Sequence, residues 1–182
     1  MLNSPVWRGS PSWAFGLGLV AGGVVSAFAL LIVGSLLRLL APSVVWLVVA
    51  AFWFVVLAVR ETGLIWFRLP QNARLVPESV FRHGRFFGPF QFGLEMGTGV
   101  RTYVTSGLPY ALIVAVALLA GPAGAVAAGI GFGLGRALMT FGNLGYDTEA
   151  SWDREFDRHA GSIRTVLFLA YAASLTAVAL TL

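Results

Sequence analysis

The sequence predicts an all-α protein, a polytopic transmembrane helix bundle, and three observations lead to this prediction. Hydrophobic residues make up 58% of the chain and charged residues only 11%, whereas a soluble domain has roughly 45–50% and 25%. The apolar residues are gathered in long uncharged runs, and the first of them, 13–37, exceeds the roughly 20 residues that a membrane span requires. A water-soluble fold of 182 residues could not bury so much apolar side chain, so lipid must be the solvent for much of it.

We expect the whole chain, residues 1–182, to form a single transmembrane domain. The expected spans are 13–37, 43–67, 90–120, 122–142 and 162–182, of which 90–120 is broken. The first apolar run is longer than the 7–15 residues of a signal-peptide core, so we interpret it as a retained first span.

The stretch 90–120 determines how many spans the bundle has. As one straight helix it would be about 46 Å long, against a hydrocarbon core of about 30 Å. Glycines and a proline offer places to break it, so it is either one helix bent at the glycines or two shorter legs that meet near 106–109. One crossing gives five spans and two crossings give six. The positive-inside rule favours five, because Arg154, Arg158 and Arg164 belong to the later connection.

Two polar connections give the expected orientation. Residues 60–88 carry five arginines, which places this loop and the N-terminus in the cytoplasm. Within the loop, Pro77-Glu78-Ser79 is expected to open a short interfacial helix. Residues 143–161 are expected to form an amphipathic surface helix that ends at Gly161.

The candidate polar site consists of ionisable and hydroxyl residues placed inside apolar sequence. Each buried charge costs roughly 2.5–3.5 kcal/mol at the bilayer centre unless it has a partner. We therefore hypothesise that Glu95 meets Arg101 or Arg136 inside the bundle, beside the hydroxyl groups of Thr98 and Thr102, at a broken helix. The alternative is a buried ion pair that only fixes helix registry, or arginines that reach the headgroup plane.

Alternating glycines mark one span as a packing helix. Gly129, Gly131, Gly133 and Gly135 form two overlapping G-x-x-x-G pairs, which let a neighbouring helix approach closely. They do not match a dinucleotide-binding loop, because no strand precedes them.

Several functional classes are excluded or disfavoured by what the sequence lacks. The chain has no cysteine, which excludes disulfides, thiolate metal sites and a thiol relay of its own. It has two histidines, one in each polar loop, and no known catalytic or nucleotide-binding motif, so we expect no metal site, no cofactor and no enzymatic activity. Its arginines are too scattered for nucleic-acid binding. The expected partners are membrane lipid and either other membrane subunits or a second copy.

Three segments resemble the second half of the CcdA/DsbD-type membrane proteins. They are Phe92–Tyr103, then Gly107-Leu108-Pro109, then Gly131–Leu138, within residues 90–140. The resemblance implies a broken-helix core, a place in the plasma membrane of a bacterium and an association with electron transfer. The chain departs from that family in lacking its redox cysteine, so the core must serve another use or act as scaffold.

Two functions from different classes follow from these residues. One is a non-catalytic subunit or scaffold of a membrane complex, in which glycine faces and amphipathic loops dock partner proteins. The other is a small-solute transporter or channel, in which Arg101 and Arg136 attract an anionic solute to a polar midplane site. The first is favoured, because the charged set is small and no site for a coupling ion is evident.

Overall fold

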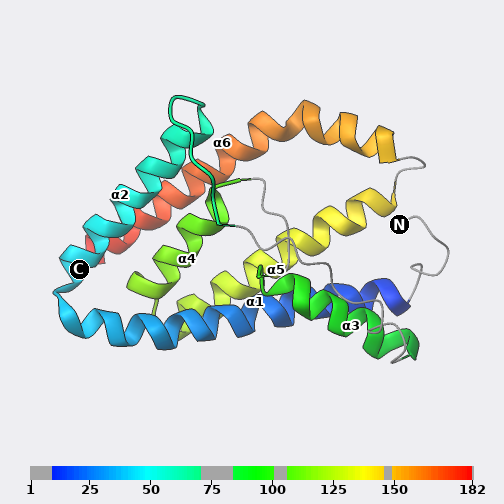
Figure 1. The fold of residues 1–182 in the computed structure, drawn as a ribbon, viewed down its shortest axis with the longest axis horizontal. Coiled ribbons are helices and arrows are strands. Elements are labelled where there is room, and N and C mark those ends of the chain that lie inside the picture. The colour runs from blue at the N-terminus through cyan, green and yellow to red at the C-terminus, as the bar shows by residue number, and fades with distance from the viewer. Residues whose placement is uncertain (1–9, 71–83, 101–105, 146–148, 182) are drawn as a thin grey trace. The chain divides into compact units, whose positions relative to one another are not determined.

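The computed structural model describes residues 10–70, 84–100, 106–145 and 149–181, and this part of the chain is all-helical, without strands. The predicted all-α class is therefore confirmed for the described residues (Figure 1). The helices in chain order are α1 (Ser10–Leu37), the short 3-10 helix η2 (Arg38–Leu40), α2 (Ser43–Glu61), α3 (Gly84–Gly97), α4 (Leu108–Leu119), α5 (Pro122–Leu144) and α6 (Glu149–Thr181).

Four of these helices are long and apolar enough to cross a membrane. The segments that qualify are Pro11–Leu40, Ser43–Glu61, Pro122–Asn143 and Ser151–Thr181. Helix α4 is apolar but has only 12 residues, about 18 Å of helix, which is shorter than the bilayer core. The number of spans, five or six, stays a prediction.

The glycine-rich stretch 90–120 forms two helices rather than one bent helix. Helix α3 ends at Gly97, and Gly99 follows with a φ of 73°, a backbone conformation that favours glycine. Helix α4 begins at Leu108 with Pro109 in its first turn, where proline leaves no helical hydrogen bond unmade. The sequence left open one bent helix or two shorter helices, and the structure has two shorter helices. Helix α3 also begins earlier than expected, at Gly84, whereas Pro77-Glu78-Ser79 lies outside the described residues.

Two other helix ends differ from the sequence prediction. Helix α2 ends at Glu61 instead of continuing to residue 67, because Gly63 turns the chain with a φ of 82°. The expected helix end at Gly161 is wrong, since α6 runs without interruption from Glu149 to Thr181. A glycine inside a helix costs only about 1 kcal/mol relative to alanine, whereas a break would leave several backbone groups without partners beside an apolar segment.

By their contacts the helices belong to two compact units. Unit 1 combines the first part of α1 with α3, most of α5 and the first turns of α6. Unit 2 combines the end of α1 with α2, α4, the first residues of α5 and the rest of α6. A single transmembrane domain over 1–182 stays a prediction.

In unit 1, α1 packs against α3 through glycines on both helices. A methyl group built at Gly22 of α1 would lie 2.8 Å from backbone atoms of Gly97 and Thr98. In the other direction, Gly93 and Gly97 of α3 lie against the backbone of α1 at Phe15 and Leu19. The contact advances along both chains in the same direction, so the two helices are parallel and run side by side in Figure 1. Backbone-to-backbone contact of this kind is what G-x-x-x-G pairs allow.

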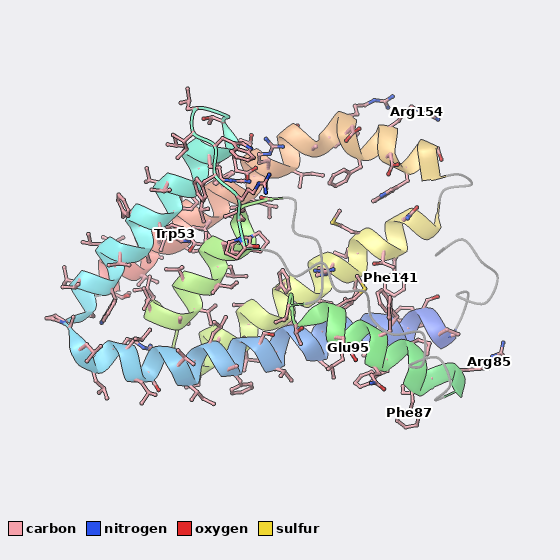
Figure 2. The ribbon with its side chains drawn as sticks, in the orientation of Figure 1. Trp53, Arg85, Phe87, Glu95, Phe141 and Arg154 are labelled. Carbon is pink, nitrogen blue, oxygen red and sulfur yellow. The ribbon has the colours of Figure 1, made fainter. Side chains whose placement is uncertain are left out.

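The same part of α1 also packs against α5, here in the antiparallel sense. Gly129 lies against Gly23 and Val24, with a built methyl group 2.7 Å from the carbonyl oxygen of Gly23. One turn further along α5, Gly133 lies against Val20 and the preceding residue of α1. The contact ends in an aromatic pair, Trp13 of α1 and Phe141 of α5, with ring centroids 5.4 Å apart (residue 141 is labelled in Figure 2).

In unit 2, α2 packs against α4 and α6, which both run antiparallel to it. The rings of Phe54 on α2 and Tyr171 on α6 stack at 4.6 Å. The Tyr171 hydroxyl donates a 2.6 Å hydrogen bond to the carbonyl of Ala111 on α4 and so joins the third helix. At the far end of α4, Arg38 donates a 2.8 Å hydrogen bond to the carbonyl of Ala120, which is an unpaired acceptor of the helix C-terminus.

We predict that Gly22→Ala lowers the free energy of unfolding by about 1–3 kcal/mol, the usual cost of overpacking, because the new methyl group meets backbone and not a flexible side chain. Gly131→Ala is the matched control on α5, where no atom of the described residues lies within 4 Å of a built methyl group. Its stability should be unchanged or raised by up to about 1 kcal/mol, the gain in helix propensity.

The measurement is unfolding of both purified variants in mild detergent, followed by far-UV circular dichroism. Equal stability of the two alanine variants would contradict the close approach of α1 and α3.

Candidate functional site

The polar residues predicted inside the membrane do not all lie in the described part of the chain. Glu95 lies on α3, Thr98 directly follows α3, and Arg136 lies on α5; all three are half-buried in unit 1. Arg101 and Thr102 lie outside the described residues. The pairing of Glu95 with an arginine therefore stays a prediction.

Thr98 closes the C-terminal end of α3 with backbone hydrogen bonds. Its hydroxyl donates a 2.7 Å hydrogen bond to the carbonyl of Glu95. Its own carbonyl accepts a 2.9 Å hydrogen bond from the hydroxyl of Ser26 on α1. Both contacts supply partners to polar groups at a helix end, which would be costly to leave unpaired in an apolar medium. The local chemistry of Thr98 is thus that of a helix cap.

Phe132 of α5 connects the end of α3 with Arg136. Its ring lies 3.8 Å from a methyl group built at Gly99, and the Arg136 guanidinium lies 5.8 Å from the ring centroid. A cation at this distance is attracted by the face of the ring. On α3, the side-chain amide of Gln91 lies 3.5 Å from a carboxylate oxygen of Glu95. Gly99 and Arg136 therefore both lie close to the ring of Phe132.

An open hollow lies on the surface of α3, lined by Phe87, Phe90, Gln91 and Leu94. Figure 2 shows Phe87 on the side of α3 that faces away from α1, on the same helix as Glu95. Three of the four lining side chains are apolar, so the hollow suits an acyl chain or an apolar side chain better than a charged solute.

A second polar cluster, which the sequence did not predict, surrounds Glu61 in unit 2. Its side chain is only 9% exposed and lies 3.1 Å from the guanidinium of Arg60 and 3.8 Å from that of Arg164. The same carboxylate accepts a 2.7 Å hydrogen bond from the backbone N–H of Gly107, at the start of α4. A negative charge is favourable at a helix N-terminus, where N–H groups lack helical partners. Glu61 therefore fastens α2, α4 and α6 together at one end.

No pattern in the sequence indicated this polar cluster around Glu61, which is called the Glu61 clamp below. Glu61 follows Arg60 at the end of an apolar run, which suggests a charge at the membrane interface. Its other two partners lie 46 and 103 positions away along the chain. A carboxylate with three polar partners is well suited to fixing helix ends.

Helix α5 has two rows of small residues on different faces. Gly129, Gly133 and Ala137 are buried, whereas Ala127 and the pair Gly131 and Gly135 are exposed. Of the four glycines predicted to pack, Gly129 and Gly133 lie against α1, and no atom of the described residues comes within 4 Å of a methyl group built at the other two. The open row is a candidate docking face for a further helix.

We predict that Glu61→Gln lowers the free energy of unfolding by about 2–4 kcal/mol, because two arginines lose the charge that compensates them. The upper end of the range for fully buried pairs is not expected, since Arg164 is half-exposed. Asp153→Asn, an exposed acid on α6, is the control and should change stability by no more than about 0.5 kcal/mol. Denaturant titration in detergent measures both variants, and a Glu61→Gln variant as stable as the control would contradict the clamp.

Comparison with known proteins found no match to this chain. No family model matches the chain, and neither a curated protein nor a solved structure matches it.

Proposed function

We propose that the chain is a non-catalytic subunit or scaffold of a membrane complex, and that the open small-residue face of α5 docks a transmembrane helix of its partner. The observation that carries this proposal is the double row of small residues on α5. One row lies at a close contact with α1, and the other has the same four-residue spacing and an exposed surface.

The open row, Gly131 and Gly135, lowers the stability of α5, and packing against a partner helix would offset this loss. Each glycine in a helix interior costs about 1 kcal/mol relative to alanine, although a methyl group at Gly131 or Gly135 would meet only open space among the described residues. Helices in lipid associate largely through close van der Waals packing, and their contact faces are enriched in small residues. A partner helix on this face would pack against Gly131 and Gly135 in the way that α1 packs against Gly129 and Gly133.

The alternative, a small-solute transporter with a polar site at Glu95, Arg101 and Arg136, has less support. The Thr98 hydroxyl caps α3, and the hollow on α3 is lined by neither Glu95 nor Arg136. The association with electron transfer depends on the resemblance of residues 90–140 alone.

We predict that Gly131→Leu releases the partner, because a leucine on the open face keeps the two helices apart. The matched control is Gly161→Leu on α6, also a helical glycine without described neighbours within 4 Å. Tagged protein is purified from its native membrane in mild detergent, and the particle mass and co-purifying proteins are determined. The unchanged protein and Gly161→Leu should yield a stoichiometric complex, and Gly131→Leu should yield the chain alone.

Two results would count against the proposal. A single 19.4 kDa chain from the unchanged protein would favour the transporter alternative, and uptake of anions into proteoliposomes would then be the next measurement. A complex that persists in Gly131→Leu would place the partner on another face.

A further inference from the structure

The loop that follows α2 exposes three consecutive large apolar side chains. Leu64 is 81% exposed, Ile65 39% and Trp66 77%. They lie outside any helix and begin three residues after Glu61, the last residue of a candidate membrane span. The loop continues beyond the end of α2 in Figure 1. Apolar side chains in this position are either covered by another molecule or in contact with the bilayer.

The base of the loop is fixed to unit 2, so the exposed tip is held in place. The Arg60 guanidinium donates a 3.0 Å hydrogen bond to the carbonyl of Phe67 and lies 5.5 Å from the centre of its ring. Leu69 is buried against α2 and α4, and the Tyr110 hydroxyl donates to the carbonyl of Pro70. A loop with these attachments presents its tip in a defined direction.

The charge around this tip is positive. Arg68 is exposed, and its guanidinium lies 6.0 Å from the Trp66 ring centre. Arg60 and the half-exposed Arg164 lie close to the base of the loop, where Glu61 is the acidic residue between them. Because that carboxylate is nearly buried, the solvent-facing charge is carried by the arginines.

We propose that residues 62–69 form an interfacial anchor that binds acidic phospholipid headgroups. Leu64 and Trp66 insert beside the upper acyl chains, and Arg68 contacts the lipid phosphate, which a guanidinium binds through two parallel hydrogen bonds. Two observations favour a lipid surface over a protein partner. The end of α2, a helix of 19 residues and about 28 Å, places the loop at the boundary of the hydrocarbon core. An aromatic side chain beside arginines is also the usual composition of that boundary.

The absence of cysteine makes the insertion directly measurable. Leu64→Cys introduces the chain's one thiol, which carries an environment-sensitive fluorophore after labelling. The labelled protein is reconstituted into vesicles of phosphatidylcholine with or without phosphatidylglycerol, together with lipids that carry a quencher near the headgroup or at the chain end. We expect stronger quenching by the shallow quencher than by the deep one. A probe accessible to aqueous iodide and to neither lipid quencher would overturn the proposal, and so would a probe that none of the three reaches, because a protein would then cover the loop.

The choice of lipid is tested with Arg68→Gln. Protein is solubilised from membranes of equal parts phosphatidylglycerol and phosphatidylcholine, and the lipids that remain bound are quantified. One basic residue near an anionic surface corresponds to about a fivefold change in binding. We therefore expect the unchanged protein to enrich phosphatidylglycerol and the variant to lose about fivefold of this enrichment.

The matched control is Arg154→Gln, an exposed arginine in unit 1, labelled in Figure 2, which should retain the full enrichment. Equal enrichment in Arg68→Gln and Arg154→Gln would overturn the assignment of the headgroup to the loop. The outcome is independent of the proposed docking face, since Gly131→Leu should leave both lipid measurements unchanged.

Discussion

Helices surrounded by lipid gain little hydrophobic free energy by associating, because acyl chains are as apolar as their side chains. What remains is close packing together with a few well-placed hydrogen bonds. Glycines on α1, α3 and α5 meet this constraint in unit 1 by bringing the three backbones into contact. The buried side chains of Phe15, Leu19 and Ala137, beside these glycines, fill the space that remains. Large apolar side chains of α2 and α6, among them Val44, Phe52 and Leu169, are by contrast exposed, as expected of surfaces that face lipid or a partner.

The polar residues of the described chain serve the same constraint. Ser26, Tyr171 and Arg38 each donate to a backbone carbonyl in or at the end of another helix. Glu61 accepts from the N-terminal N–H of Gly107 and pairs with two arginines. The contacts at Thr98, Ala120 and Gly107 satisfy backbone groups at the ends of α3 and α4, the two short helices formed by the glycine-rich stretch. A broken helix in lipid needs such partners, which explains why hydroxyl and charged residues occur in so apolar a sequence.

Two surfaces of the described residues are the basis of the proposed contacts outside the chain. The open row on α5 suits another helix, since small residues lower the distance at which two backbones can meet. The loop after α2 combines an exposed tryptophan with an arginine and suits the headgroup layer. Both surfaces belong to the proposals made above, one for a partner helix and one for lipid.

The sequence by itself indicated a membrane protein built from helices, because the length of an uncharged run and the spacing of glycine and proline are local properties. It indicated the all-α class and α5 as a packing helix, and it left open whether the stretch 90–120 is one bent helix or two shorter ones. It did not distinguish Gly129 and Gly133 from Gly131 and Gly135, since both pairs have the same spacing and only the neighbour decides which is buried. It also placed a helix end at Gly161 where the chain continues. The partners of Glu61 were decided by tertiary structure alone, because a carboxylate finds a distant N–H and a distant arginine only when three helix ends meet.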